Sequence, residues 1–144
     1  MKIIFLDVDG VLNYYSFHKN SEKIVSVDDE CIKNLREIIN KTGAKVVLSS
    51  SWRLSQNKID FLERKIGIRF YDILGSDCYK SGDNITWLTR GQLIRNWLSD
   101  NQCDKYVILD DENDDMDNML LVKTNYFTDG LNQTLTQTAI NMLR

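Results

Sequence analysis

Acidic and hydroxyl side chains follow three apolar runs of this sequence. Asp7 and Asp9 come after the first run, Ser49 after the second, and Asp110 and Asp111 after the third. If the runs are parallel strands, their carboxyl ends meet at one edge of a sheet, which is where open α/β sheets bind ligands. Carboxylates crowded at one point repel one another unless a cation neutralises them. Oxygen ligands of this kind suit Mg²⁺ together with a substrate phosphate, so the sequence predicts a magnesium site there.

The same residues predict the hydrolysis of a phosphate monoester. Asp7 is the predicted nucleophile, because a carboxylate can accept a phosphoryl group and the acyl phosphate is readily hydrolysed. Asp9, two residues later, is placed to protonate the leaving oxygen and then to take a proton from water. Gly10 allows a sharp turn without a side chain that would obstruct the substrate. Ser49 can hold a phosphoryl oxygen through its hydroxyl.

Two parts of the predicted site have alternative candidates. Asp110 and Asp111 are spaced to complete the metal site beside Asp7, but Asp111 and Asp115 are spaced to share that task as well. Phosphoryl transfer also needs a cation that faces the developing charge. Arg90 is the first candidate and Lys80 the second. An arginine in the first turn of a helix opposes the helix dipole, which indicates that Arg90 has another purpose.

Strands and helices must alternate along the chain to position these residues. The pattern predicts strands at residues 3–6, 45–48, 71–74 and 106–109 and an edge strand at 120–123. It predicts helices from residue 28 to Gly43, from Ser55 to Ile66, from Thr89 to Leu98 and from 131 to 143. The fold class is therefore α/β: a Rossmann-like three-layer sandwich with a central, mostly parallel sheet. We expect residues 1–144 to form one domain.

Four segments of the chain resemble the motifs of the haloacid-dehalogenase-like (HAD) superfamily, in the order of that family. Residues 5–12, FLDVDGVL, are similar to its first motif, in which the first aspartate is the nucleophile and the second the acid/base. Residues 46–49, VVLS, resemble the second motif, Arg90 the third, and residues 107–111, VILDD, the fourth. By this resemblance Asp9 also gives its backbone carbonyl to the metal. Two positions differ, because the third motif is more often lysine and a threonine usually stands where this chain has Val11.

The distances between these motifs predict a site without a large cap domain. Only 38 residues lie between Gly10 and Ser49, and 36 between Arg53 and Arg90. A capless site admits a large substrate, such as a nucleic-acid end or a phosphoprotein segment. The segment at 49–53 and the helix that begins at Arg90 are similar to capless HAD modules associated with RNA repair. By that resemblance Ser50 and Arg53 bind substrate, Arg53 through a phosphate, and Trp52 stacks on a base or packs locally.

The composition excludes several other classes of protein. The net charge of −3 gives no general attraction to nucleic acid. The three cysteines lack metal-binding spacing and are expected to be reduced thiols in the cytoplasm. No apolar run is long enough for a membrane span, and nothing indicates an obligate protein partner. His18, the only histidine, gives poor support for a histidine base.

Three further readings compete with a polynucleotide phosphatase. A phosphoprotein or a small metabolite could supply the phosphate instead of a DNA or RNA end. A signalling receiver domain also uses acidic residues and Mg²⁺, but receivers place the paired acids on the first strand and the phosphate acceptor later, the reverse of the order here. A binding module without turnover is the third reading, although no expected catalytic position is missing.

Overall fold

The computed structural model describes residues 1–15 and 26–144, so His18 lies outside the described part of the chain. Its centre is a five-stranded sheet in which every pairing is parallel. The strands, in spatial order, are β3 (Asp72–Ile73), β2 (Lys45–Leu48), β1 (Lys2–Leu6), β6 (Lys105–Asp110) and β7 (Leu121–Lys123).

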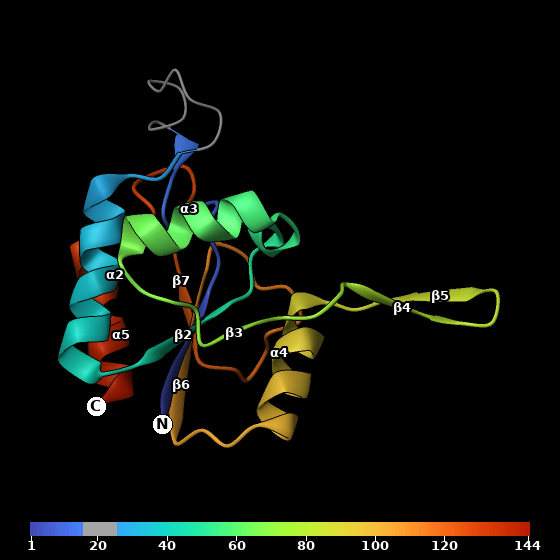
Figure 1. Ribbon diagram of the computed structural model, residues 1–144. Helices are drawn as coiled ribbons and strands as arrows, with labels where there is room; N and C mark the ends of the chain where they lie inside the picture. Colours follow the sequence, from blue (N-terminus) through green and yellow to red (C-terminus); the bar gives the residue numbers. More distant parts are fainter. Residues whose placement is uncertain (16–25) are drawn as a thin grey trace.

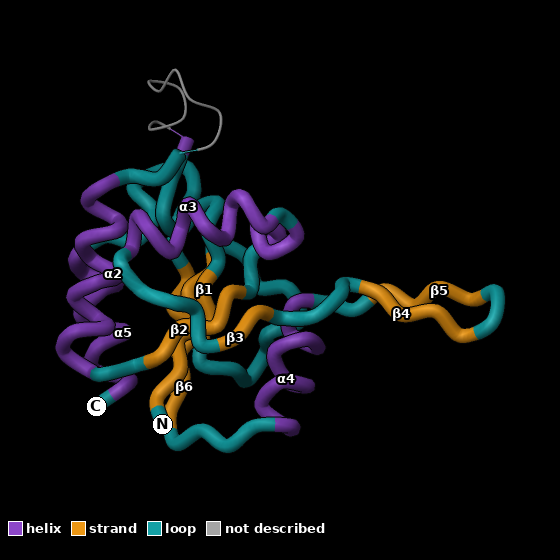
Figure 2. Tube along the Cα trace, viewed as in Figure 1, coloured by secondary structure: helices purple, strands orange, loops and turns teal. Residues whose placement is uncertain are grey.

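Helices cover both faces of this sheet and produce three layers (Figure 2). On one face lie α2 (Asp29–Thr42), α3 (Gln56–Ile66) and α5 (Gln133–Leu143), and on the other lies α4 (Arg90–Asp100). The alternation of side chains along a strand explains this division. Ile4 and Leu6 of β1 pack with the first set of helices, whereas Ile3 and Phe5 pack with α4. The predicted α/β three-layer fold with a parallel sheet is confirmed.

Polar caps set the helix boundaries close to where the sequence predicts them. The Asp28 side chain accepts the backbone N–H of Glu30 at the start of α2, and Gly43 ends that helix in the left-handed conformation. Ser55 caps α3, and Thr89 forms a capping box with Gln92 at the start of α4. The predicted third strand is shorter than expected, since only residues 72 and 73 pair with β2.

Two elements escape the sequence prediction. A 3₁₀ helix, η1 (Ser51–Leu54), follows β2, and an antiparallel hairpin is formed by β4 (Cys78–Ser81) and β5 (Asn84–Trp87). The hairpin extends away from the sheet and its helices (Figure 1). In the described part of the chain, the segments between the motifs hold only the helices that cover the sheet, η1, the short strand β3 and this hairpin, so no large cap domain is present there. In that same part of the chain, no helix has the length and apolar character needed to cross a membrane.

The register of the sheet brings its polar strand ends to one edge. Leu6 of β1 pairs with Leu48 of β2 and with Leu109 of β6. The residues that follow these three leucines therefore emerge side by side, because parallel strands in register end at the same level. This edge holds most of the predicted site.

Candidate active site

Three carboxylates converge where β1 and β6 end. Asp7 follows β1, Asp110 is the last residue of β6, and Asp111 comes next in the chain. One carboxylate oxygen of each residue lies within 4.8 Å of those of the other two. The Asp7 backbone N–H donates to the Leu109 carbonyl oxygen at 3.0 Å, so the pairing of the strands continues up to the acids. We call these three residues the acidic cluster.

Burial disfavours the charged forms of two carboxylates in the acidic cluster. The pKa of Asp7 is raised from 3.8 to about 8, first by burial and then by the Asp110 carboxylate, against the opposing effect of Arg90. The pKa of Asp110 is raised to about 6, chiefly by burial. A cation bound between the carboxylates would lower both pKa values, because positive charge favours the ionised forms.

Arg90 is the cation that faces the acidic cluster. One of its guanidinium nitrogens lies 3.7 Å from an Asp7 carboxylate oxygen and 3.6 Å from one of Asp110. Arg90 is the first residue of α4, and its backbone N–H donates to the Asp114 carboxylate at 2.9 Å. The other candidate, Lys80, lies on the exposed hairpin opposite Ile85. The geometry therefore favours Arg90 for the role of the phosphate-facing cation.

The loop that follows β6 is docked on the start of α4. The Gly91 N–H donates to the Asp114 carbonyl oxygen at 2.8 Å, and a β-carbon on Gly91 would lie 1.8 Å from the Asp115 carbonyl oxygen. Only a glycine permits this approach.

The Asp115 carboxylate accepts from the Thr89 hydroxyl at 3.0 Å and from Arg95 at 2.6 Å. Asp115 is thus outside the acidic cluster, and the geometry favours Asp110 and Asp111 for the metal site.

The carboxylate of Asp9 is held in place by two side chains. Its oxygens accept from the Asn13 amide at 3.0 Å and from the Trp52 indole N–H at 3.1 Å. Trp52 is only 4% exposed, so it packs locally and does not offer a face to a base. Sequence reasoning missed Asn13, although asparagine shortly after a turn glycine is a recognisable signal for side-chain bonding to the local backbone.

Gly10 lets the first motif pass close to the acidic cluster. It has a φ of 84°, and a β-carbon there would lie 2.4 Å from the Asp111 carboxyl carbon. Its N–H donates to the Asn13 side-chain oxygen at 3.0 Å, and its carbonyl accepts from the Thr124 hydroxyl at 2.6 Å. Gly10 is therefore a packing requirement of the acidic cluster, which adds to its predicted role beside the substrate.

Ser49 and Ser50 are both buried beside the end of β1 but have different partners. The Ser49 N–H donates to the Leu6 carbonyl oxygen at 2.9 Å. Its hydroxyl is buried and has no hydrogen-bond partner among the described residues. The Ser50 hydroxyl accepts the Trp52 N–H at 3.1 Å and caps η1. An unpaired buried hydroxyl is costly, so Ser49 is the better candidate for a ligand contact.

Arg53 has a different environment from the one expected of a phosphate ligand. Its guanidinium donates to the carbonyl oxygens of Ser49, Ser50, Leu74 and Gly75 and to the Asp77 carboxylate. Its side chain is 1% exposed. All five guanidinium N–H groups thus have protein acceptors, and the role of Arg53 is to join η1 to the segment after β3. Bidentate binding of a substrate phosphate would require those bonds to break.

We therefore expect Arg53→Ala to act on stability. Several buried carbonyl oxygens would lose their donors, and the free energy of unfolding should fall by about 3 kcal/mol. Urea unfolding measures this loss, and the exposed Arg64→Ala on α3 is the matched control, expected to change stability by about 0.5 kcal/mol or less. Wild-type stability combined with a raised KM would instead restore the substrate-binding role.

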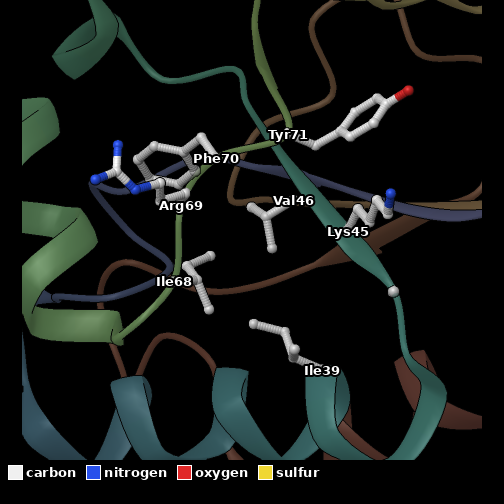
Figure 3. Close-up of a pocket in the computed structure, with 8 residues that line it drawn as sticks. Ile39, Lys45, Val46, Ile68, Arg69, Phe70 and Tyr71 are labelled. Carbon is white, nitrogen blue, oxygen red and sulfur yellow. The ribbon is translucent and has the colours of Figure 1, made fainter.

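Of the pockets in the described residues, one opens beside the acidic cluster and another lies apart from it. The first has a volume of about 390 Å³ and is lined by Asp111 and by residues 123–127, among others. The other, of about 360 Å³, lies at the start of β2 and is lined by Ile39, Val46 and Phe70 among others (Figure 3). No predicted site residue lines the pocket in Figure 3, so it takes no part in the site.

The donors of the acidic cluster fit Mg²⁺. All are carboxylate oxygens, the ligand type that Mg²⁺ combines with water and substrate phosphate. Arg90 brings one positive charge to three carboxylates, which leaves the acidic cluster short of positive charge. The Asp9 carboxylate is outside the acidic cluster, and the backbone carbonyl of Asp9 stays the predicted fourth protein ligand.

Comparison with known proteins agrees with this geometry. The family described as "HAD domain in Swiss Army Knife RNA repair proteins" matches residues 3–135, nearly the whole chain. No curated protein and no solved structure matches this chain. The match covers all four motifs and supports a phosphatase-like function in the context of RNA repair. The chain thus belongs to the HAD domain family of Swiss Army Knife RNA repair proteins.

Proposed function

We propose that this protein is a Mg²⁺-dependent phosphatase that hydrolyses a phosphate monoester through a phosphoaspartate on Asp7. The observation that carries the proposal is the convergence of Asp7, Asp110 and Asp111 with the guanidinium of Arg90. The family match adds a nucleic-acid context, so the favoured substrate is a phosphorylated DNA or RNA end. We propose the cytoplasm as its compartment, because all three cysteines are free thiols.

The reaction proceeds in two displacement steps. In the first, an Asp7 carboxylate oxygen bonds to phosphorus, the bond from phosphorus to the leaving oxygen breaks, and Asp9 gives that oxygen a proton. In the second, Asp9 takes a proton from water as the water oxygen bonds to phosphorus and the bond from phosphorus to the Asp7 oxygen breaks. Inorganic phosphate leaves, and the Asp7 carboxylate is regenerated.

The remaining residues hold the phosphoryl group during both steps. Mg²⁺ held by the acidic cluster and the Asp9 carbonyl would neutralise charge on the phosphoryl oxygens. Arg90 adds a second positive charge, and the Ser49 hydroxyl donates to a phosphoryl oxygen. Ser50 and Gly10 line the same strand ends. Asn13 and Trp52 fix the orientation of the Asp9 carboxylate. Because its side chain is already ordered, Asp9 loses little conformational entropy when it transfers the proton.

A substrate screen tests this proposal. Purified protein should release phosphate from a generic aryl phosphate in Mg²⁺ and lose that activity in excess chelator. The rate of phosphate release should then be compared at equal concentration for phosphorylated DNA and RNA ends, phosphopeptides and small phosphorylated metabolites. We expect the nucleic-acid ends to be hydrolysed fastest. Preference for a phosphopeptide or a metabolite would correct the substrate class. Absence of turnover on every class would favour a binding module.

Ser49→Ala should separate activity from stability. The Ser49 hydroxyl has no partner among the described residues, so its removal should leave the free energy of unfolding unchanged or raise it by about 1 kcal/mol. The loss of a donor to the phosphoryl group should lower kcat by about 10²-fold. Ser50→Ala is the contrasting neighbour, because loss of its bond to the Trp52 N–H should lower stability by about 1 kcal/mol. A destabilised Ser49→Ala with unchanged kcat would contradict the assignment.

A further inference from the structure

The pocket beside the acidic cluster is bordered by an aromatic group that the proposed chemistry does not use. We call Tyr15, Tyr126 and Phe127 the aromatic rim. Their ring centroids lie 6.3 Å apart for Tyr15 and Tyr126, 6.4 Å for Tyr15 and Phe127, and 5.4 Å for Tyr126 and Phe127. Phe127 is 76% exposed and Tyr15 49% exposed. Aromatic rings that lie together at the surface beside a reaction site form a patch of the kind that a ligand covers.

The aromatic rim is continuous with the catalytic edge of the sheet. The pocket is lined by Asp111 of the acidic cluster and by Lys123, Tyr126 and Phe127. A phosphate held at Asp7 and Asp111 therefore leaves its attached group within reach of this pocket. The position of the pocket therefore fits the leaving group of the substrate, and the residues that line the pocket indicate the chemistry of that group.

Hydrogen bonds hold the aromatic rim in position. The Tyr15 N–H donates to the Tyr126 carbonyl oxygen at 2.7 Å, and the Thr124 N–H to the Asp110 carbonyl oxygen at 2.9 Å. The Phe127 N–H donates to the Asn125 side-chain oxygen at 2.9 Å. The first bond ties the segment after β7 to the segment after β1, the second ties it to the end of β6, and the third is local to the segment. The segments after β1 and after β7 reach the same end of the molecule (Figure 1). A pre-ordered platform of this kind loses little entropy when it binds a planar ligand.

We propose that this pocket binds the nucleobase of the nucleotide that carries the reacting phosphate, with the base stacked on Phe127. A base presents a planar face to the ring, and its polar edges can bond to the amide and carboxylate groups of Asn125 and Glu112, which also line the pocket. Lys123 is exposed and has no acidic partner within 4.0 Å among the described residues, so it is available to the neighbouring phosphodiester. The inference rests on the proposed phosphatase function and names its substrate as a nucleotide end with an unstacked terminal base.

The test compares two oligonucleotides that differ only in the terminal base. Both carry the same terminal phosphate, and one lacks the base on the last sugar. In Mg²⁺ the wild-type protein should show a KM about 10-fold or more lower for the base-bearing end, with a much smaller difference in kcat, because stacking is equal in the ground and transition states. Ribose and deoxyribose versions of the pair separate RNA from DNA.

Variants at Phe127 assign the preference to stacking. Phe127→Ala and Phe127→Leu should reduce the KM preference to about threefold or less, whereas Phe127→Trp should retain it, since a larger ring stacks at least as well. Tyr79→Ala is the matched control, because Tyr79 is an exposed aromatic residue of the hairpin, and it should leave the preference as in the wild type. An unchanged preference in Phe127→Ala would overturn the assignment.

The outcomes distinguish failure of this inference from failure of the proposed function. If the wild type hydrolyses both ends with equal KM, the base site is wrong while the phosphatase stands. If neither end is hydrolysed in Mg²⁺, the phosphatase proposal fails for these substrates. Equilibrium binding of the two oligonucleotides then tests the base site independently of turnover. An affinity about 10-fold higher for the base-bearing oligonucleotide, lost in Phe127→Ala, supports the base site, and equal affinity overturns it.

Discussion

Asp7→Asn is expected to lower kcat by about 10⁴-fold or more, because the amide cannot accept the phosphoryl group that the carboxylate accepts. The substitution keeps the shape of the side chain, so the fold should persist with the same circular dichroism spectrum. The measurement is release of phosphate from an aryl phosphate in Mg²⁺. Brief reaction with a substrate labelled in its phosphoryl group, followed by acid quenching, should leave label on the wild type and none on Asp7→Asn.

The control for Asp7→Asn is another aspartate changed in the same way. Asp100→Asn, at the exposed end of α4, should retain activity within about twofold, since surface substitutions have small effects. Full activity in Asp7→Asn would remove the nucleophile from the mechanism. Loss of activity with retention of label would move the nucleophile to another residue.

Saturating Mg²⁺ should stabilise the folded protein strongly. At about 100 times its dissociation constant, a ligand that binds only the folded state raises the free energy of unfolding by about 2.7 kcal/mol, which corresponds to a rise in Tm of roughly 5–10 °C. Thermal melts in Mg²⁺, in chelator and in a monovalent salt of equal ionic strength measure this effect apart from screening. Asp110→Asn should lose most of the rise. Equal Tm values with and without Mg²⁺ would contradict a metal site at the acidic cluster.

The pH dependence of the same melts follows from the raised pKa values. In chelator, folded Asp7 holds its proton up to about pH 8 and Asp110 up to about pH 6, whereas both lose it near pH 3.8 when unfolded. The folded state therefore binds more protons across this window, and stability should fall as pH rises from about 4 to about 8. Mg²⁺ should reverse the trend, because it binds the ionised carboxylates. Asp7→Asn in chelator should flatten the fall, and a stability that rises over this window would contradict the assignment.

The positions of the acidic residues could be predicted because they depend on local pattern. Apolar runs of strand length identified β1, β2 and β6, and parallel strands place their carboxyl ends at one edge. Asp7 and Asp110 therefore meet through the sheet, with Ser49 at the same edge. Caps such as Ser55 and Thr89 are equally local, since they bond to backbone groups within three residues.

The hairpin between β3 and α4 could not be predicted from pattern. Its residues alternate between two faces, but neither face is buried in a core, and all four residues of β5 are exposed. Hydrophobic periodicity indicates which face of an element is buried. A hairpin that extends away from the sheet and its helices has no buried face, so its sequence shows no such periodicity. The local sign of it is the two-residue turn Gly82-Asp83 between the strands, in which Gly82 has a φ of 62°.

The order of residues along this chain specifies its α/β class, its motifs and the edge of the sheet at which they meet, because these depend on short-range periodicity and strand direction. Packing in three dimensions selects the partners of the long polar side chains. Arg53 bonds to carbonyl groups more than 20 residues away, and Trp52 reaches Asp9 across 43 positions. Such bonds form between segments that only the assembled sheet brings together, and for that reason Arg53 joins two segments while Arg90 faces the acidic cluster.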